Sequence, residues 1–153
     1  MSELVLRPWE PTDHDVIVGQ AYDCLAELHA AGSDLLPTLD NAERFWRIGM
    51  HWTTAGDPTL CATLDDRIVA WVLWGGIEGD FQRALRVCHG HGTYVVPTER
   101  RRGIASVLRR AAGVIAKRRG YGKVVGTMYD EAGRASGRAA GFVPVATQME
   151  WTL

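Results

Sequence analysis

The chain has 153 residues, 46% of them hydrophobic and 23% charged, and its formal net charge is −1. This length and composition suit a single domain over residues 1–153 with a sizeable core. The balance of charge argues against general binding to nucleic acid, which usually needs a basic surplus. The start of the chain has no signal-peptide pattern, and the longest apolar run is too short to span a bilayer, so we expect a cytoplasmic protein with no membrane partner.

The first part of the chain predicts one strand followed by two helices. Residues 4–7 form a short expected strand that ends at a proline. Apolar residues recur across 13–30 with the spacing of an amphipathic helix. A second helix follows the loop at 32–37, where Asp40 and Glu43 resemble a capping box. The buried face of this second helix is expected to carry Ala42, Phe45, Trp46, Gly49 and Trp52.

The pattern then changes from helices to strands. The runs 59–64 and 67–77 are rich in β-branched and aromatic residues, and Asp65-Asp66 between them is a hairpin signal. The second run is apolar on both alternating sets of positions, which is typical of a strand that is covered on both faces.

A long strand and the clearest helix of the chain come next. The strand is predicted at 85–96, and Gly90 and Gly92 within it suit a β-bulge or a close approach of another backbone. The helix begins near residue 104 and ends in a basic turn at 117–119, where cations suit the helix dipole. Its buried stripe is expected to consist of Ile104, Val107, Leu108, Ala111 and Ile115.

The remaining chain predicts a strand at 123–129, a short helix at 131–140, and two closing strands at 142–146 and 148–153. The full order is β-α-α-β-β-β-α-β-α-β-β, which indicates a mixed α/β domain with helices covering a central sheet. The last strand is apolar at 149–153, and this suits pairing across a homodimer interface.

The loop at 95–106, between the long strand and the clearest helix, has the composition of an anion site. Three arginines at 100–102 oppose the positive end of the helix dipole, so stability alone does not favour them. A helix start exposes unpaired N–H groups that bind anions, and the small residues Gly103 and Ala105 let a phosphate approach. A solvated basic turn is the alternative. The glycine spacing excludes a dinucleotide-binding fingerprint, and no Gly-Lys-Ser/Thr follows for a nucleotide-hydrolase loop.

The pattern Arg100-x-x-Gly103-x-Ala105, preceded by Val95-x-Pro97 and followed by an amphipathic helix, resembles the GNAT superfamily of acyl-CoA-dependent N-acyltransferases. The predicted order of elements agrees with that superfamily over most of the chain, and Gly141-Phe142 is a pair that follows the last helix in many members. The resemblance implies a GNAT-like α/β fold and acetyl-CoA as co-substrate. It also implies acetyl transfer to a primary amine of a small molecule, an amino acid or a peptide.

The resemblance further implies which residues bind coenzyme A (CoA). The end of the long strand pairs with the pantetheine arm, the loop amides hold the pyrophosphate, and a position that is Asn in many members is Asp130 here. The expected CoA-binding residues are Thr93, Tyr94, Val95, Arg100, Arg101, Arg102, Gly103, Ile104, Ala105, Ser106 and Asp130.

One position departs from the superfamily pattern. Many members carry a tyrosine that protonates the departing CoA thiolate, and Gly137 stands there in this chain. Ser136 and Tyr129 are candidate substitutes, and water is a third, because a thiolate is already a tolerable leaving group. The departure indicates an alternative function, namely a GNAT-fold module that binds acyl-CoA without turnover.

Acyl transfer to an amine needs a base, and histidine has a suitable pKa. Strand alternation directs His89 and His91 to one face unless a bulge intervenes. Some superfamily members have a glutamate base at the position of His89, so we expect His89 to be the base, with His91 second. The alternatives are structural histidines with deprotonation through water, or a metal site. No Cys, Asp or Glu partner is positioned by the sequence, so we expect no metal.

The other candidate groups are less informative. Cys24, Cys61 and Cys88 are odd in number and widely spaced, which predicts buried free thiols. In the superfamily the two N-terminal helices usually line the acceptor side. Asp34 or Glu43 would attract a cationic amine there and Trp46 would cover it, although a solvated acidic face and a core tryptophan are the alternatives. The Lys and Arg residues clustered between 100 and 119 indicate a nucleobase or nucleic-acid acyltransferase as a further alternative. The acidic residues of the chain offset this positive charge, which argues against that alternative.

Overall fold

The computed structural model describes residues 3–76 and 86–145. Within them a five-stranded sheet has the order β1-β2-β3-β4-β5. Strands β1 to β4 pair antiparallel, and β5 lies parallel to β4. The strands are β1 (Leu4–Pro8), β2 (Leu60–Leu64), β3 (Arg67–Gly76), β4 (Arg86–Val95) and β5 (Tyr121–Gly126).

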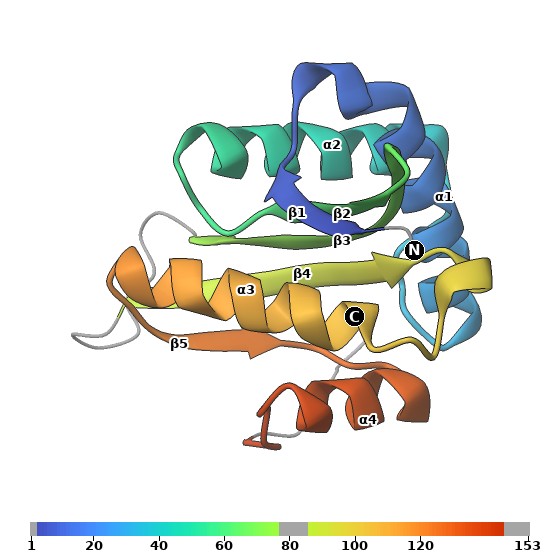
Figure 1. Cartoon of the computed structure of the whole chain (residues 1–153). Helices are drawn as coiled ribbons and strands as arrows, with labels where there is room; N and C mark the ends of the chain where they lie inside the picture. Colours follow the sequence, from blue (N-terminus) through green and yellow to red (C-terminus); the bar gives the residue numbers. More distant parts are fainter. Residues whose placement is uncertain (1–2, 77–85, 146–153) are drawn as a thin grey trace.

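Helices cover both faces of this sheet (Figure 1). Helices α1 (His14–Ala30) and α2 (Leu39–Thr54) pack on one face, and α3 (Ile104–Arg118) packs on the other. Helix α4 (Glu131–Ala139) contacts α3. Short 3₁₀ turns, Pro11–Asp13 and Pro97–Glu99, precede α1 and α3. The mixed α/β fold class expected from the sequence is confirmed.

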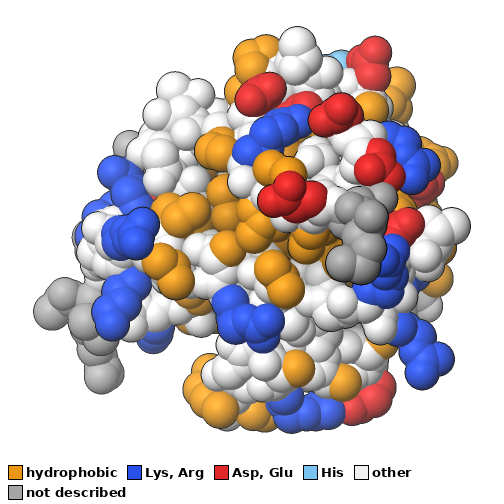
Figure 2. Space-filling model, viewed as in Figure 1, with side chains coloured by type: hydrophobic (Ala, Val, Ile, Leu, Met, Phe, Trp, Pro, Cys, Tyr) orange, Lys and Arg blue, Asp and Glu red, His pale blue; other side chains and the backbone are white. Residues whose placement is uncertain are grey.

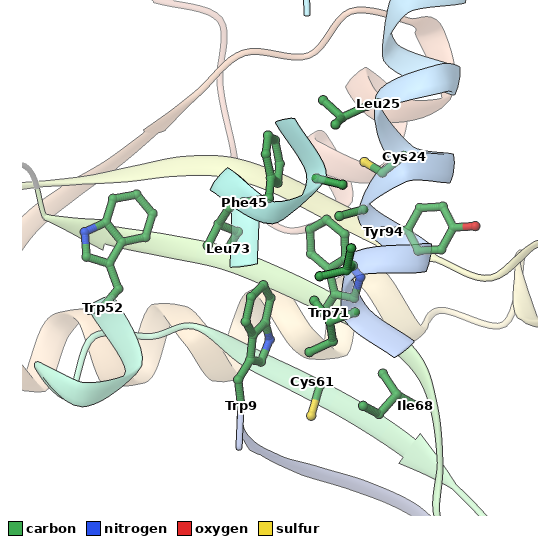
Figure 3. Packing of buried hydrophobic residues seen from close by; sticks show 14 residues of the cluster. Trp9, Cys24, Leu25, Phe45, Trp52, Cys61, Ile68, Trp71, Leu73 and Tyr94 are labelled. Atoms are coloured by element: carbon green, nitrogen blue, oxygen red, sulfur yellow. The ribbon is translucent and has the colours of Figure 1, made fainter. Parts of the chain in front are cut away.

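The core has two layers because β3 is buried on both faces. Trp71 and Leu73 face the layer under α1 and α2, whereas Val72 and Trp74 face the layer under α3. Figure 3 shows the first layer, in which aromatic side chains from α2, β3 and β4 meet. The free thiols of Cys24, Cys61 and Cys88 are buried in these layers, as expected.

Two local features predicted from the sequence, the β2–β3 turn and the cap of α2, have different outcomes. In the turn, Asp65 and Asp66 both have positive φ angles, 48° and 60°, as a tight two-residue hairpin requires. At α2 the expected capping box is wrong. Thr38 is the N-cap instead, because its backbone is extended and its hydroxyl accepts a hydrogen bond from the Asn41 N–H at 3.2 Å.

A β-bulge in β4 controls the shape of the sheet near the site. The β3–β4 register passes from Leu73 opposite Gly92 to Trp74 opposite Gly90, so His91 is the extra residue. The pairing of β4 with β5 ends at Gly90 and Gly126, while β4 continues to Val95 (Figure 1). A bulge bends and twists its strand, which explains why β5 ends at Gly126 and not at the expected residue 129.

The expected closing strand at 142–146 is wrong over its described part. Residues 142–145 have no regular secondary structure, and the side chains of Val143 and Val145 are 72% and 81% exposed. Alternating apolar residues form a strand only beside a pairing partner, and no strand in the described chain pairs with them. The strand expected at 148–153, and the homodimer pairing suggested for it, lie outside the described residues.

Candidate active site

A cleft of about 720 Å³ opens where β4 and β5 diverge. Its walls come from α1, the second half of β4, the loop before α3, the first turns of α3, and the segment that runs from β5 into α4. Past Gly90, the edge of β4 that faces β5 has no strand partner in the described residues. An extended ligand can therefore pair with this edge as an additional strand would.

The start of α3 forms one end of this cleft and has the geometry of an anion site. Gly103 is the N-cap with φ +77°, and Arg101 has φ +64°. Left-handed backbone at a non-glycine residue is strained and is typical of functional loops. No hydrogen bond joins the N–H groups of 101–103 to another described residue. These groups and the first N–H groups of α3 remain available for an anion.

The three loop arginines differ in what they contact. Arg100 donates to the Val95 carbonyl at 2.9 Å and to Glu27 of α1 at 2.6 Å, and the contact with Glu27 raises the pKa of Arg100. Arg102 pairs with Glu99 and does not line the cleft. Arg101 does line it. Arg100 thus fixes the loop to α1, which leaves Arg101 as the better placed of the three to meet an anion.

The wider charge distribution on this face is uneven. Figure 2 shows Lys and Arg side chains on the left, around the end of α3, and also on the right and lower margins, whereas most Asp and Glu side chains lie in the upper part of the view. Of the helices beside the cleft, α3 carries Arg109, Arg110, Lys117 and Arg118 and no acidic residue, so its surface favours the approach of an anionic ligand.

The other residues expected to bind CoA also line the cleft. Thr93 and Val95 lie on the free edge region of β4. Tyr94 is 4% exposed and its ring stacks on Trp71 at 5.8 Å, so its side chain belongs to the core. The Asp130 carboxylate accepts a hydrogen bond from the Gly133 N–H at 2.6 Å and caps α4.

The two histidines lie close together at the bulge. Their ring centroids are 6.3 Å apart, and both residues line the cleft. His91 also approaches Trp52 of α2, with 5.1 Å between ring centroids. His91 is exposed at the mouth of the cleft, and partial desolvation of its ring together with the neighbouring charge of His89 lowers its pKa. A neutral imidazole near neutral pH is what a general base requires.

The cysteines of the protein are not reactive nucleophiles. Cys24 lines the cleft, but burial raises its pKa to about 12, and the same cause raises the pKa of Cys61 and of Cys88 to about 12. Such thiols are protonated and inert near neutral pH. In the part of the chain that the structure describes, no three His, Cys, Asp or Glu side chains gather as metal ligands.

The residues suggested for the amine acceptor lie outside the cleft. Asp34 is an exposed loop residue. Glu43 contacts His14 at 3.1 Å on the outer side of α1 and α2, and Trp46 stacks on Trp9 with 5.7 Å between centroids. The structure gives no support to a substrate role for these three. The α1 side of the cleft is lined instead by Cys24, Glu27, Leu28 and Leu35.

Sequence reasoning missed Arg109, which lines the cleft from α3. Its Nε donates to Thr93 Oγ1 at 3.3 Å, and its Nη1 donates to Ser136 of α4. The available signal was its spacing, because Arg109 lies one turn after Ala105 and so shares that face of the helix.

Sequence reasoning also missed the neighbour of Gly137. A Cβ built on Gly137 would lie 2.6 Å from Sδ and Cε of Met128. The Met128 side chain therefore occupies the direction in which a larger residue at 137 would project, and nothing in the sequence around Met128 indicates this contact.

The comparisons with known proteins agree with this architecture. The model of the acetyltransferase (GNAT) family matches residues 24–141, and the chain therefore belongs to that family. A search of curated protein sequences finds no significant match.

Solved structures resemble the whole chain at low sequence identity. A GCN5-related N-acetyltransferase from Ralstonia eutropha JMP134 has a TM-score of 0.76 and 20% identity, with 99% of each chain covered. The aminoglycoside N-acetyltransferase AAC(6')-Iy in complex with CoA has a TM-score of 0.74 and 16% identity, with 100% of this chain and 96% of that chain covered. At these identities the similarity establishes the fold. Within the described residues, no helix has the length and apolar character needed to cross a bilayer.

Proposed function

We propose that the protein transfers an acetyl group from acetyl-CoA to the primary amine of a small molecule, an amino acid or a peptide. One observation carries the proposal: a single cleft joins a helix start with unpaired backbone N–H groups to a pair of histidines at the β4 bulge. The helix start suits the pyrophosphate of CoA, and the free edge of β4 suits its pantetheine arm.

The histidine pair supplies the base that the amine needs. The sequence favoured His89, but two features of the structure favour His91. It is the bulged residue, beyond the last paired residues of β4 and β5, and its pKa is lowered. The neutral amine bonds to the acetyl carbon, the proton that its nitrogen then loses passes to the neutral imidazole, and the carbon–sulfur bond breaks with its electron pair left on sulfur.

The charges in the cleft support an acceptor with a single amine. Aminoglycosides, the substrates named for some of the similar structures, are polycations that need uncompensated acidic groups. Of the described carboxylates that line the cleft, Glu27 pairs with Arg100, Glu99 pairs with Arg102, and Asp130 caps α4. Little acidic charge is left over there for a polycation.

Release of free thiol from acetyl-CoA across a panel of amines tests this proposal. The panel contains amino acids, short peptides, simple monoamines and one aminoglycoside. We expect release that depends on the amine and is strongest for a monoamine. CoA binding without release for any amine would instead support the acyl-CoA-binding module, which Gly137 and its contact with Met128 favour.

A further inference from the structure

We propose that Arg109 stabilises the CoA thiolate that leaves during the transfer, so that the enzyme needs no proton donor for it. This inference rests on the proposed acetyl transfer. It concerns the leaving group, for which Gly137 supplies no acid.

The place where a larger side chain would project from α4 is already filled. Gly137 has no side chain, and Met128 occupies the space in front of its Cα. A thioether donates no proton. Ser136, the nearest hydroxyl on α4, already accepts a hydrogen bond from Arg109. Tyr129, the other candidate acid, also lines the cleft. A sulfur that departs as an anion needs no acid, however, because a nearby cation stabilises it.

Arg109 is a cation of that kind. Its side chain is half-buried between α3, β4 and α4, and it has no carboxylate partner among the described residues. Several other arginines do have one: Arg7, Arg100, Arg102, Arg134 and Arg138. Burial without a compensating anion lowers the pKa of Arg109. An anionic ligand would relieve this cost.

The hydrogen bonds of Arg109 orient its side chain and use only some of its N–H donors. Thr93 and Ser136 each accept one N–H, and neither carries a charge. The remaining N–H donors of the guanidinium are left for a ligand in the cleft. Because the guanidinium is already oriented before the ligand binds, it does not have to reorganise when negative charge develops on the sulfur.

The base and this cation lie on opposite sides of the sheet. His91 contacts Trp52 of α2, which covers one face, whereas Arg109 belongs to α3, which covers the other. Both line the same cleft, beyond the last paired residues Gly90 and Gly126. A thioester held in this gap would have the base that serves the amine on one side and the cation that meets the leaving sulfur on the other, so the two groups do not compete for the same place.

The step is balanced without any further reactant. The amine nitrogen forms the new bond to the acetyl carbon, and its proton passes to the imidazole of His91. The electron pair of the broken carbon–sulfur bond remains on sulfur, as a thiolate paired with the Arg109 guanidinium. The thiolate takes a proton from water when CoA is released.

The test is the pKa of the CoA thiol when it is bound, read from its ultraviolet thiolate absorbance during a pH titration. The thiols of the protein do not interfere, because burial raises the pKa of Cys24, Cys61 and Cys88 to about 12. Acetyl-CoA, which has no free thiol, gives the background. We expect the bound thiol to ionise about one pH unit below the thiol of free CoA titrated in the same buffer, a tenfold change in the thiolate-to-thiol ratio.

Variants then assign the effect to the guanidinium. Arg109→Gln keeps hydrogen-bonding capacity but loses the charge, and we expect the thiol pKa to return to its ordinary value. We also expect kcat to fall by about 10²-fold with little change in the KM for acetyl-CoA. Arg109→Lys should keep part of both effects. Arg110→Gln, at an exposed neighbour on the same helix, is the matched control and should behave as the wild type.

Several outcomes overturn the inference. If the thiol pKa of CoA bound to the wild type equals that of free CoA, the inference is wrong, even if Arg109→Gln fails to fold. The inference is also wrong if the lowered thiol pKa persists in Arg109→Gln. Equal weakening of CoA and acetyl-CoA at every pH would assign Arg109 to the phosphates. Amine acetylation with an unshifted thiol would reject the role of Arg109 alone, whereas a shifted thiol without any acetylation would reject the proposed function.

Discussion

At the scale of single residues, the bulge in β4 decides which histidine is best placed as a base. His89 lies opposite Gly75 on β3 and Val125 on β5, inside the paired part of the sheet. His91 has no partner in the β3 register and stands at the point where β4 leaves β5. The charge of His89 contributes to the lowered pKa of His91. The two residues therefore have different expected roles, with His91 as base and His89 as the neighbour that tunes it.

Substitution of each histidine by alanine separates these roles. His91→Ala should lower kcat/KM by about 10²–10⁴-fold, as for a lost general base, and should remove the acidic limb of the pH profile. In the wild type that limb should lie below the ordinary histidine pKa of 6.5, because the folded protein disfavours the charged ring. His89→Ala removes a nearby positive charge, so the limb should move up towards 6.5 with a smaller loss of rate.

The reverse pattern would contradict this assignment. A large loss only in His89→Ala would restore the expectation drawn from the sequence. Small and similar losses in both variants, with the acidic limb retained, would favour deprotonation through water.

At the scale of secondary-structure elements, one buried ion pair fixes the start of α1 to β1. Both Asp13 oxygens accept from Arg7, at 2.7 and 2.8 Å, and Oδ2 also accepts from the Glu10 N–H at 2.7 Å. Burial alone would raise the pKa of Asp13, but the bonds from Arg7 and Glu10 outweigh it and lower that pKa. The turn between β1 and α1 therefore depends on the ionised carboxylate.

Asp13→Asn should lower the free energy of unfolding by about 3 kcal/mol, the lower end for a broken buried pair, because Arg7 keeps some contact with water. The pKa of Asp13 is lower in the folded state than its ordinary value of 3.8, so the stabilisation is fully present above that value. It is lost as the pH falls through the folded pKa. Urea unfolding at pH 7 and at acid pH measures the difference between variant and wild type, which should shrink in acid. Asp15→Asn, at a side chain that is 98% exposed, is the control and should cost little. If Asp13→Asn and the wild type differed in free energy of unfolding by the same amount at both pH values, this role of the ionised Asp13 would be contradicted.

The elements themselves could largely be predicted from the sequence. Helical and strand periodicities, the Asp65-Asp66 turn and the glycines around the bulge are local patterns, and the structure follows them. The errors fall where the outcome depends on more distant partners. Thr38 displaced Asp40 as the cap of α2, and the alternating residues at 142–145 have no neighbouring strand in the described chain to pair with.

At the scale of the whole molecule, the cleft is assembled from segments that are far apart in the chain. The loop at 100–106 could be predicted because its residues are contiguous and its chemistry is local. Arg109, Glu27 and Met128 reach the cleft only through the packing of α3, α1 and the segment after β5. No motif in the sequence around any of these three residues indicates a site, so they could not be identified from the sequence.

The central claim is that CoA binds at the start of α3, and calorimetric titration with CoA tests it most directly. Ligand binding to the native state stabilises the whole fold, so melting temperatures give a second reading of the same samples. Gly103→Glu places bulk and negative charge where the pyrophosphate is expected. Gly32→Glu is the matched control, because both glycines have positive φ, +77° and +102°, and open space where a Cβ would lie, while Gly32 does not line the cleft. We predict that the wild type and Gly32→Glu bind CoA alike and that Gly103→Glu does not bind it. CoA binding to Gly103→Glu with wild-type affinity would contradict the claim.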